Sequence, residues 1–154
     1  MPQGRSLVNI SSNGKARILL ADDHQAILDR ACELLDGKFE LVGMAQNGKD
    51  ALEAIDAMQP DVLVLDIGMP ALDGIRVMQQ LQEKRSPTKV VFLTVQDDPD
   101  YVEAAFHYGA RGYVTKPRMN SDLVSAVQEV LAGRTFISPT VAFSGDGLAP
   151  KAQD

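Results

Sequence analysis

The chain has 154 residues, an ordinary apolar content for a globular protein, and a formal net charge of −6. The length predicts one domain with a substantial core, and the lack of a long apolar run excludes a membrane-spanning helix. The negative charge argues against direct nucleic-acid binding, and the polar N-terminal stretch argues against a signal peptide. Because the single cysteine, Cys32, cannot form an internal disulfide, we expect an inert buried thiol and a cytoplasmic location.

Short runs rich in β-branched residues alternate with helical patterns along the middle of the chain. Gly37 stands where the first helical pattern ends, Asn47 and Pro60 stand at the start and end of the second, and Asp98 stands where a later one begins. This alternation predicts parallel strands joined by helices. Five strands are expected at residues 17–21, 39–44, 62–66, 89–93 and 112–115, each followed by a helix.

The two ends of the chain fall outside this alternation. We expect residues 1–15 to form a flexible arm, residues 16–136 to form the folded domain, and residues 137–154 to form a tail or the remnant of a linker. Two short apolar stretches near the C-terminus, 136–139 and 141–143, are apolar enough to pack on the domain or on a partner.

Polar residues that could take part in catalysis or ligand binding follow four of the expected strands. Asp22 and Asp23 come after the first, Asp66 after the third, Thr94 after the fourth and Lys116 after the fifth. The crevice beyond the carboxyl ends of the strands is where such sheets bind ligands. We therefore expect all five side chains at one edge of the sheet.

Three carboxylates at one edge need compensation, because two like charges about 4 Å apart repel by roughly 4 kcal/mol at an effective dielectric near 20. An all-oxygen set favours a hard cation, Mg²⁺ or Mn²⁺. With an ammonium from Lys116 and a hydroxyl from Thr94, such a site would support in-line attack by Asp66 on phosphorus, giving an aspartyl phosphate. Taken singly, each residue has a simpler interpretation as a helix cap or a solvated charge.

Four motifs carry a resemblance over about residues 15–136. They are Leu20–His24 with its paired acids, Asp66–Gly74 with its Met-Pro and Asp-Gly, Phe92–Thr94, and Gly109–Pro117. In this order they resemble the receiver domain of bacterial two-component response regulators. The resemblance implies an α/β, flavodoxin-like fold: a doubly wound, five-stranded parallel sheet of order 2-1-3-4-5 with helices on both faces.

The resemblance also implies a metal site around the phosphoacceptor, Asp66. Asp23 would bind Mg²⁺ (or Mn²⁺) directly, Asp22 would act mostly through water, and the backbone carbonyl of Gly68 would complete the protein ligands. We expect His24 to cap the first helix rather than to bind the cation, because hard cations favour oxygen.

The same resemblance assigns a switch. Lys116 would contact the phosphoryl oxygens, Thr94 would hydrogen-bond to the attached group, and Tyr113 would swing inward as Thr94 moves. It also implies a cis peptide bond between Lys116 and Pro117. Val95 stands where many receivers carry a smaller residue, so we expect it to slow access to the phosphoryl group.

The expected partners are a sensor histidine kinase or phosphotransfer protein, a downstream protein target, and a second copy of the chain; neither nucleic acid nor membrane is expected. Residues 130–139 resemble the receiver end of a subfamily that often continues into a LuxR-type helix-turn-helix. These 154 residues contain no such domain. We expect either a receiver cut from a longer regulator or, as the start at Met1 favours, a stand-alone one.

Three alternatives to a phosphorylation switch stay open. An Asp-nucleophile phosphatase would carry a second Asp two residues after the nucleophile, where this chain has Gly68. A flavodoxin-like cofactor binder would carry a phosphate loop rich in Ser and Thr after the first strand. A degenerate receiver would act as an adaptor without phosphate. We expect the chain not to be an enzyme beyond its own phosphorylation and dephosphorylation.

Overall fold

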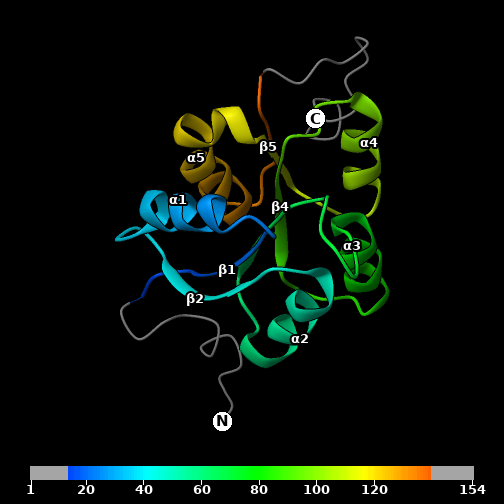
Figure 1. Ribbon diagram of the computed structural model, residues 1–154. Coiled ribbons are helices and arrows are strands. Elements are labelled where there is room, and N and C mark those ends of the chain that lie inside the picture. The colour runs from blue at the N-terminus through cyan, green and yellow to red at the C-terminus, as the bar shows by residue number, and fades with distance from the viewer. Residues whose placement is uncertain (1–13, 140–154) are drawn as a thin grey trace.

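Six parallel strands form one sheet in the computed structural model, which describes residues 14–139 (Figure 1). The strand order is β2-β1-β3-β4-β5-β6, so the predicted flavodoxin-like order 2-1-3-4-5 is confirmed and extended by one strand. Most of the expected arm and tail, including the apolar stretch 141–143, lies outside the described residues. The strands are β1 (Arg17–Ala21), β2 (Glu40–Ala45), β3 (Val62–Leu65), β4 (Lys89–Thr94), β5 (Gly112–Thr115) and β6 (Phe136–Ile137).

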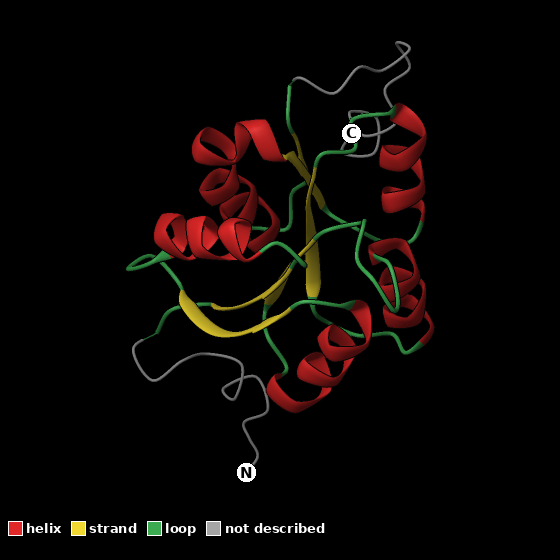
Figure 2. Ribbon diagram, viewed as in Figure 1, coloured by secondary structure: helices red, strands yellow, loops and turns green. Residues whose placement is uncertain are grey.

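Helices cover both faces of the sheet (Figures 1 and 2). One face carries α1 (Gln25–Leu35) and α5 (Met119–Leu131). The other carries α2 (Gly48–Met58), α3 (Gly74–Glu83) and α4 (Pro99–His107). A short 3-10 helix, η2 (Lys116–Arg118), joins β5 to α5. This two-layered covering explains why the central strands are apolar at almost every position.

Strand alternation divides the core into two clusters. In β1, Ile18 and Leu20 face the α1–α5 layer, whereas Leu19 and Ala21 face the layer of α2, α3 and α4. All four side chains are at most 2% exposed. Since burying one large apolar side chain stabilises a fold by about 1.5–3 kcal/mol, the two clusters hold the sheet between its helices.

Local sequence signals set the helix ends, as predicted for Asn47, Asp98 and Gly37. The side chains of Asn47, Asp73 and Asp98 each accept a backbone N–H of the first turn of the helix that follows. Beyond the last turn of α1, Gly37 adopts a φ of 81°, a left-handed conformation that favours glycine. These caps fix where each connecting loop enters and leaves the sheet.

The strand β6 was not predicted. Phe136 and Ile137 pair in parallel with Gly112 and Tyr113 of β5, so the apolar stretch after α5 packs on the domain. Ser138 continues this pairing by donating its backbone N–H to the Tyr113 carbonyl at 2.9 Å. The sheet therefore includes residues that follow α5.

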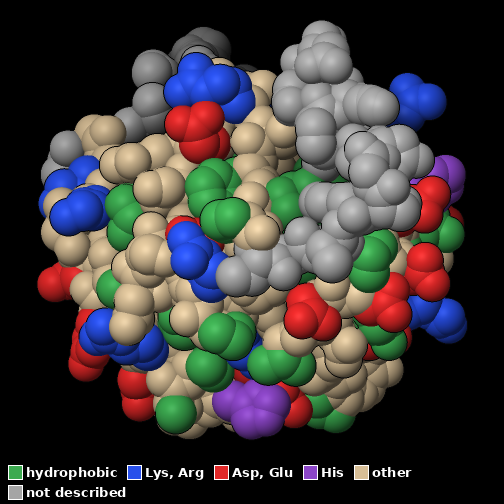
Figure 3. All heavy atoms as spheres, turned by 90° about the horizontal axis from the view of Figure 1, so that it is seen from above, with side chains coloured by type: hydrophobic (Ala, Val, Ile, Leu, Met, Phe, Trp, Pro, Cys, Tyr) green, Lys and Arg blue, Asp and Glu red, His purple; other side chains and the backbone are tan. Residues whose placement is uncertain are grey.

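The visible surface carries mixed charges. Looking from above Figure 1, Lys and Arg side chains lie among Asp and Glu side chains rather than in a continuous basic band on the described part of this face (Figure 3). No helix within residues 14–139 is long and apolar enough to cross a bilayer.

Candidate phosphoacceptor site

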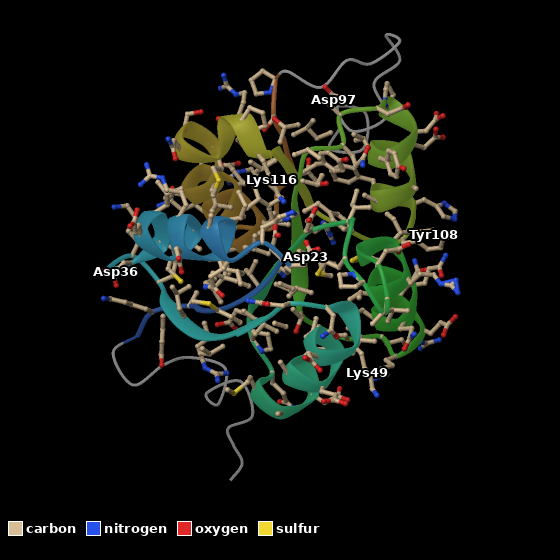
Figure 4. The ribbon with its side chains drawn as sticks, in the orientation of Figure 1. Asp23, Asp36, Lys49, Asp97, Tyr108 and Lys116 are labelled. Atoms are coloured by element: carbon tan, nitrogen blue, oxygen red, sulfur yellow. The ribbon has the colours of Figure 1, made fainter. Side chains whose placement is uncertain are left out.

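The structure brings the five predicted site residues together at the carboxyl edge of the sheet. Asp22 and Asp23 follow β1, Asp66 follows β3, Thr94 ends β4 and Lys116 begins η2 directly after β5. Asp23 and Lys116 point into the same central region between the helical layers (Figure 4). The parallel sheet thus delivers side chains from four strands to one place.

Asp66 lies at the centre of this group and is only 4% exposed. Its Oδ1 accepts the backbone N–H of Ile67 at 2.7 Å, and its Oδ2 accepts a hydrogen bond from Lys116 Nζ at 3.2 Å. Burial raises the pKa of the Asp66 carboxyl, and the nearby charge of Asp22 raises it further. Lys116 and the Thr94 hydroxyl act in the opposite direction, so a partly compensated carboxylate faces the crevice.

Lys116 bridges two of the three acids. Its Nζ lies 2.9 Å from Asp22 Oδ2 and 3.2 Å from Asp66 Oδ2. Burial lowers the pKa of the Lys116 ammonium, but hydrogen bonding and attraction to Asp22 and Asp66 outweigh it, and the pKa is raised overall. The ammonium is therefore held charged beside the carboxylate that is expected to react.

His24 is the N-cap residue of α1, as expected, and its carbonyl accepts the backbone N–H groups of Ile27 and Leu28. Its side chain makes no capping hydrogen bond and contacts the acids instead. Its Nδ1 lies 3.1 Å from one oxygen of Asp22 and 3.1 Å from one oxygen of Asp23. A hydrogen on Nδ1 can be donated to either carboxylate oxygen, which keeps the imidazole beside the acids.

The acids fit a divalent cation. One ligand atom from each of Asp22, Asp23, His24 and Asp66 lies within 4.8 Å of the others. Asp22 Oδ2 and Asp23 Oδ1 are shielded from solvent, and their close polar neighbours are Lys116 Nζ and His24 Nδ1. Three carboxylates beside one ammonium still leave an excess of negative charge, which a divalent cation held by Asp22, Asp23 and Asp66 would compensate.

Gly68 lies two residues after Asp66, in the exposed loop before α3. No atom lies within 4 Å of the position that a side chain at Gly68 would take. Gly68 itself is exposed, and a role for its carbonyl in metal binding stays a prediction.

The two predicted switch residues, Thr94 and Tyr113, both contact the loop between β4 and α4. Thr94 is fully buried, and its hydroxyl accepts the backbone N–H of Gln96 at 3.3 Å. Tyr113 is also fully buried and donates its hydroxyl proton to the Gln96 carbonyl at 2.5 Å. Burial, with the nearby Asp97 charge, raises the pKa of the Tyr113 phenol. Both side chains thus contact the same β4–α4 loop, with the Tyr113 ring inside the protein.

The loop that carries Lys116 differs from expectation in one respect. All peptide bonds within residues 14–139 are trans, including the bond between Lys116 and Pro117. The expectation of a cis bond there was wrong. Pro117 lies at the start of η2, where its fixed φ suits a helical turn.

Sequence reasoning missed a polar cluster beside this loop. The carboxylate of Asp122, in the first turn of α5, is only 5% exposed and accepts hydrogen bonds from Arg118, Ser121 and Ser138. An Asp in the first turn of a helix is common for electrostatic reasons alone. Its contact with Ser138 depends on β6, which gave no clear local signal.

Comparisons with known proteins agree with this arrangement. The family model described as "Response regulator receiver domain" matches residues 18–128. The "Uncharacterized transcriptional regulatory protein YvfU" of Bacillus subtilis is 35% identical over 130 residues, which are 83% of this chain and 65% of that protein. For the "Transcriptional regulatory protein DegU" of Brevibacillus brevis the identity is 32%, over 84% of this chain and 56% of that protein. The chain thus spans somewhat less than two thirds of either relative.

Solved structures give the same result. The signal receiver domain of the putative response regulator NarL from Mycobacterium tuberculosis superposes with a TM-score of 0.74 at 34% identity, covering 78% of this chain and 98% of that one. A two-component response regulator of the LuxR family from Aurantimonas superposes with a TM-score of 0.79 at 27% identity, covering 91% of this chain and 99% of that one.

Proposed function

The chain belongs to the response regulator receiver domain family, whose members work in phosphorylation-controlled signalling, and we propose that Asp66 is its phosphoacceptor. The observation that carries the proposal is the buried Asp66 carboxylate, which lies 3.2 Å from an ammonium and next to two further acids. This combination of nucleophile, cation site and positive charge is what phosphoryl transfer requires.

The transfer forms one bond and breaks one. A carboxylate oxygen of Asp66 attacks phosphorus in line, and the bond from phosphorus to the donor's leaving atom breaks, with the electron pair leaving on the donor. The ammonium of Lys116 neutralises charge on the phosphoryl oxygens. The hydroxyl of Thr94 reorients from Gln96 toward the attached group. A Mg²⁺ or Mn²⁺ held by Asp22, Asp23, Asp66 and the Gly68 carbonyl would supply further charge neutralisation.

The output of this reaction is a change of surface. Phosphorylation adds nearly two negative charges and three acceptor oxygens at Asp66. Movement of Thr94 toward these oxygens releases the backbone N–H of Gln96, whose carbonyl holds Tyr113. The β4–α4 loop and the adjacent surface of α4 and β5 would then change shape together. The free energy available is the difference in affinity of the phosphoryl group for the two shapes.

The phosphoryl donor we propose is a sensor histidine kinase or a phosphotransfer protein. The downstream partner is a protein target or a second copy of the chain. The net charge of −6 on this chain does not favour direct contact with nucleic acid. The chain is consumed stoichiometrically in this reaction, so it is not a conventional enzyme.

Intact-mass spectrometry tests the proposal. The protein is incubated with acetyl phosphate and Mg²⁺, beside Asp66→Asn. We expect the parent alone to gain one phosphoryl group and to lose it again with time. A folded parent that gains none would refute the proposal, and the degenerate-receiver alternative would replace it. Steady turnover of a phosphomonoester would support the phosphatase alternative instead.

A further inference from the structure

The loop that carries Lys116 is tied on both sides to one buried carboxylate. Before the lysine, the backbone N–H of Thr115 donates to Ser138 Oγ at 3.2 Å, and Ser138 Oγ donates to Asp122 Oδ2 at 2.8 Å. After the lysine, Arg118 donates to both Asp122 oxygens, at 2.9 and 3.1 Å. These contacts of Arg118, Asp122 and Ser138 are here called the Asp122 clasp.

The buried members of the clasp, Asp122 and Ser138, form a hydrogen-bonded polar network that the partly exposed Arg118 closes from outside. Ser138 is 1% exposed, and its hydroxyl accepts one hydrogen bond and donates another. Burial raises the pKa of Asp122, but hydrogen bonds from Arg118, Ser138 and Ser121 outweigh it and the pKa is lowered overall, so the carboxylate stays charged. Buried networks in which every member is satisfied restrict their surroundings to one geometry.

The position of Lys116 depends on this geometry. Its Nζ lies 2.9 Å from Asp22 Oδ2 and 3.2 Å from Asp66 Oδ2, and it has to remain beside Asp66 to meet the phosphoryl oxygens during transfer. The residue before it is fixed by Ser138, and the 3-10 turn after it is fixed through Arg118. Since phosphoryl transfer depends on positioning and preorganised charge, freedom in this loop should slow the chemistry.

We propose that Asp122 and Ser138 are positioning residues for Lys116, so that the phosphorylation rate depends on the segment after α5 being docked on the sheet. The proposal rests on the function proposed above. It extends that function to residues that do not contact the reacting atoms. Ser138 belongs to the residues that follow α5, so displacement of this segment would break its hydrogen bond to Thr115 and free the loop that carries Lys116.

Four proteins test the proposal: the parent, Ser138→Ala, Arg118→Ala and Thr88→Val as the matched control. Thr88 also uses its hydroxyl in one hydrogen bond to the backbone, to the Pro60 carbonyl at 2.9 Å, but it precedes β4 at the opposite edge of the sheet. The measurements are the rate constant for phosphorylation by acetyl phosphate, the affinity for Mg²⁺ alone by calorimetry, hydrogen exchange at the Thr115 amide, and the urea midpoint.

We expect Ser138→Ala to slow phosphorylation roughly five- to tenfold, as for the loss of one ordered hydrogen bond, and to lose protection at the Thr115 amide. Arg118→Ala should slow it to a smaller extent, and the partly exposed Arg118 side chain keeps this variant informative if Ser138→Ala fails to fold. Mg²⁺ affinity should stay close to that of the parent in both variants, because Asp22, Asp23 and Asp66 are intact. A purely structural role would instead lower the urea midpoint without slowing phosphorylation relative to the Mg²⁺ affinity.

Two results overturn the proposal. In the first, Ser138→Ala and Arg118→Ala phosphorylate as fast as Thr88→Val. In the second, their rates fall only in proportion to their Mg²⁺ affinities. Failure of the parent itself to take a phosphoryl group would count against the proposed function. In that case hydrogen exchange still tests the Asp122 clasp, and retained protection at the Thr115 amide in Ser138→Ala would refute it.

Discussion

Replacement of Gly74 by alanine should distort the loop that follows the phosphoacceptor. Gly74 begins α3, and a Cβ placed on it would lie 2.2 Å from the Asp66 carbonyl oxygen and 2.9 Å from Ile67 Cα. Both are backbone atoms, so no side-chain rotation relieves the contact. The N–H of Gly74 also donates to the Ile67 carbonyl at 2.8 Å, which closes the loop between these residues.

The expected cost follows from three contributions. Overpacking against rigid backbone costs about 3 kcal/mol, the upper end for an added methyl group in a packed site. Weakening the Gly74–Ile67 hydrogen bond costs about 1 kcal/mol. The better helix propensity of alanine offsets about 1 kcal/mol. We therefore expect Gly74→Ala to lower the free energy of unfolding by about 3 kcal/mol and the melting temperature by about 6–12 °C.

Circular dichroism in urea measures this loss, which suits a chain without tryptophan. Gly43→Ala is the matched control. A Cβ at Gly43 in β2 would meet only Leu19 Cδ1 at 3.2 Å and Met58 Cε at 3.9 Å, both ends of flexible side chains. Its free energy of unfolding should stay within about 1 kcal/mol of the parent value.

The same substitution should also impair the site. Displacing the Asp66 carbonyl moves its side chain relative to Lys116, so phosphorylation by acetyl phosphate should slow even where Gly74→Ala is fully folded. A variant as stable and as rapidly phosphorylated as Gly43→Ala would refute the reasoning, because it would show that the loop has room that the structure does not give it.

Four further predictions concern single residues. Tyr113→Phe should lower the free energy of unfolding by about 1 kcal/mol through the lost bond to Gln96, and should increase hydrogen exchange in the β4–α4 loop. Val95→Ala should shorten the lifetime of the aspartyl phosphate; equal lifetimes would show that this exposed side chain does not restrict access. Ala71→Gly should stabilise the protein by up to about 1 kcal/mol in thermal unfolding, since Ala71 has a φ of 69°. The lowered pKa of Asp122 contributes stability that is fully present above pH 3.8 and is lost as the pH falls through the pKa of the folded state. In Asp122→Asn the free energy of unfolding should therefore depend less on pH below 3.8 than in the parent.

The sequence predicted the sheet because each strand carries its own signal. Periodicity, caps and glycines are local, and β1 and β5 were placed at the residues where the structure has them. β6 has only two residues, both partly exposed, and it exists because β5 offers an unpaired edge. A strand whose stability comes entirely from its neighbour leaves little trace in its own sequence.

The site was predictable to the extent that strand ends determine it. Asp22, Asp66 and Lys116 were expected to meet because parallel strands align their carboxyl ends, and the structure brings them within ion-pair distance. The contact of His24 with the acids depends on the orientation of its side chain at the start of α1. The contact of Asp122 with Ser138 depends on a pairing after α5. Neither could be inferred from spacing along the chain.

The direction of β6 determines where the described chain ends. The polypeptide leaves α5 at the amino side of the sheet, and a parallel sixth strand carries it back across, so that Pro139 emerges on the same side as Asp66. A chromophore or reporter domain joined at this point would begin at the same edge of the sheet as Asp66, three strands along from β3, instead of at the opposite edge. The exit point of the polypeptide therefore offers a direct attachment site for an optical sensor of phosphorylation.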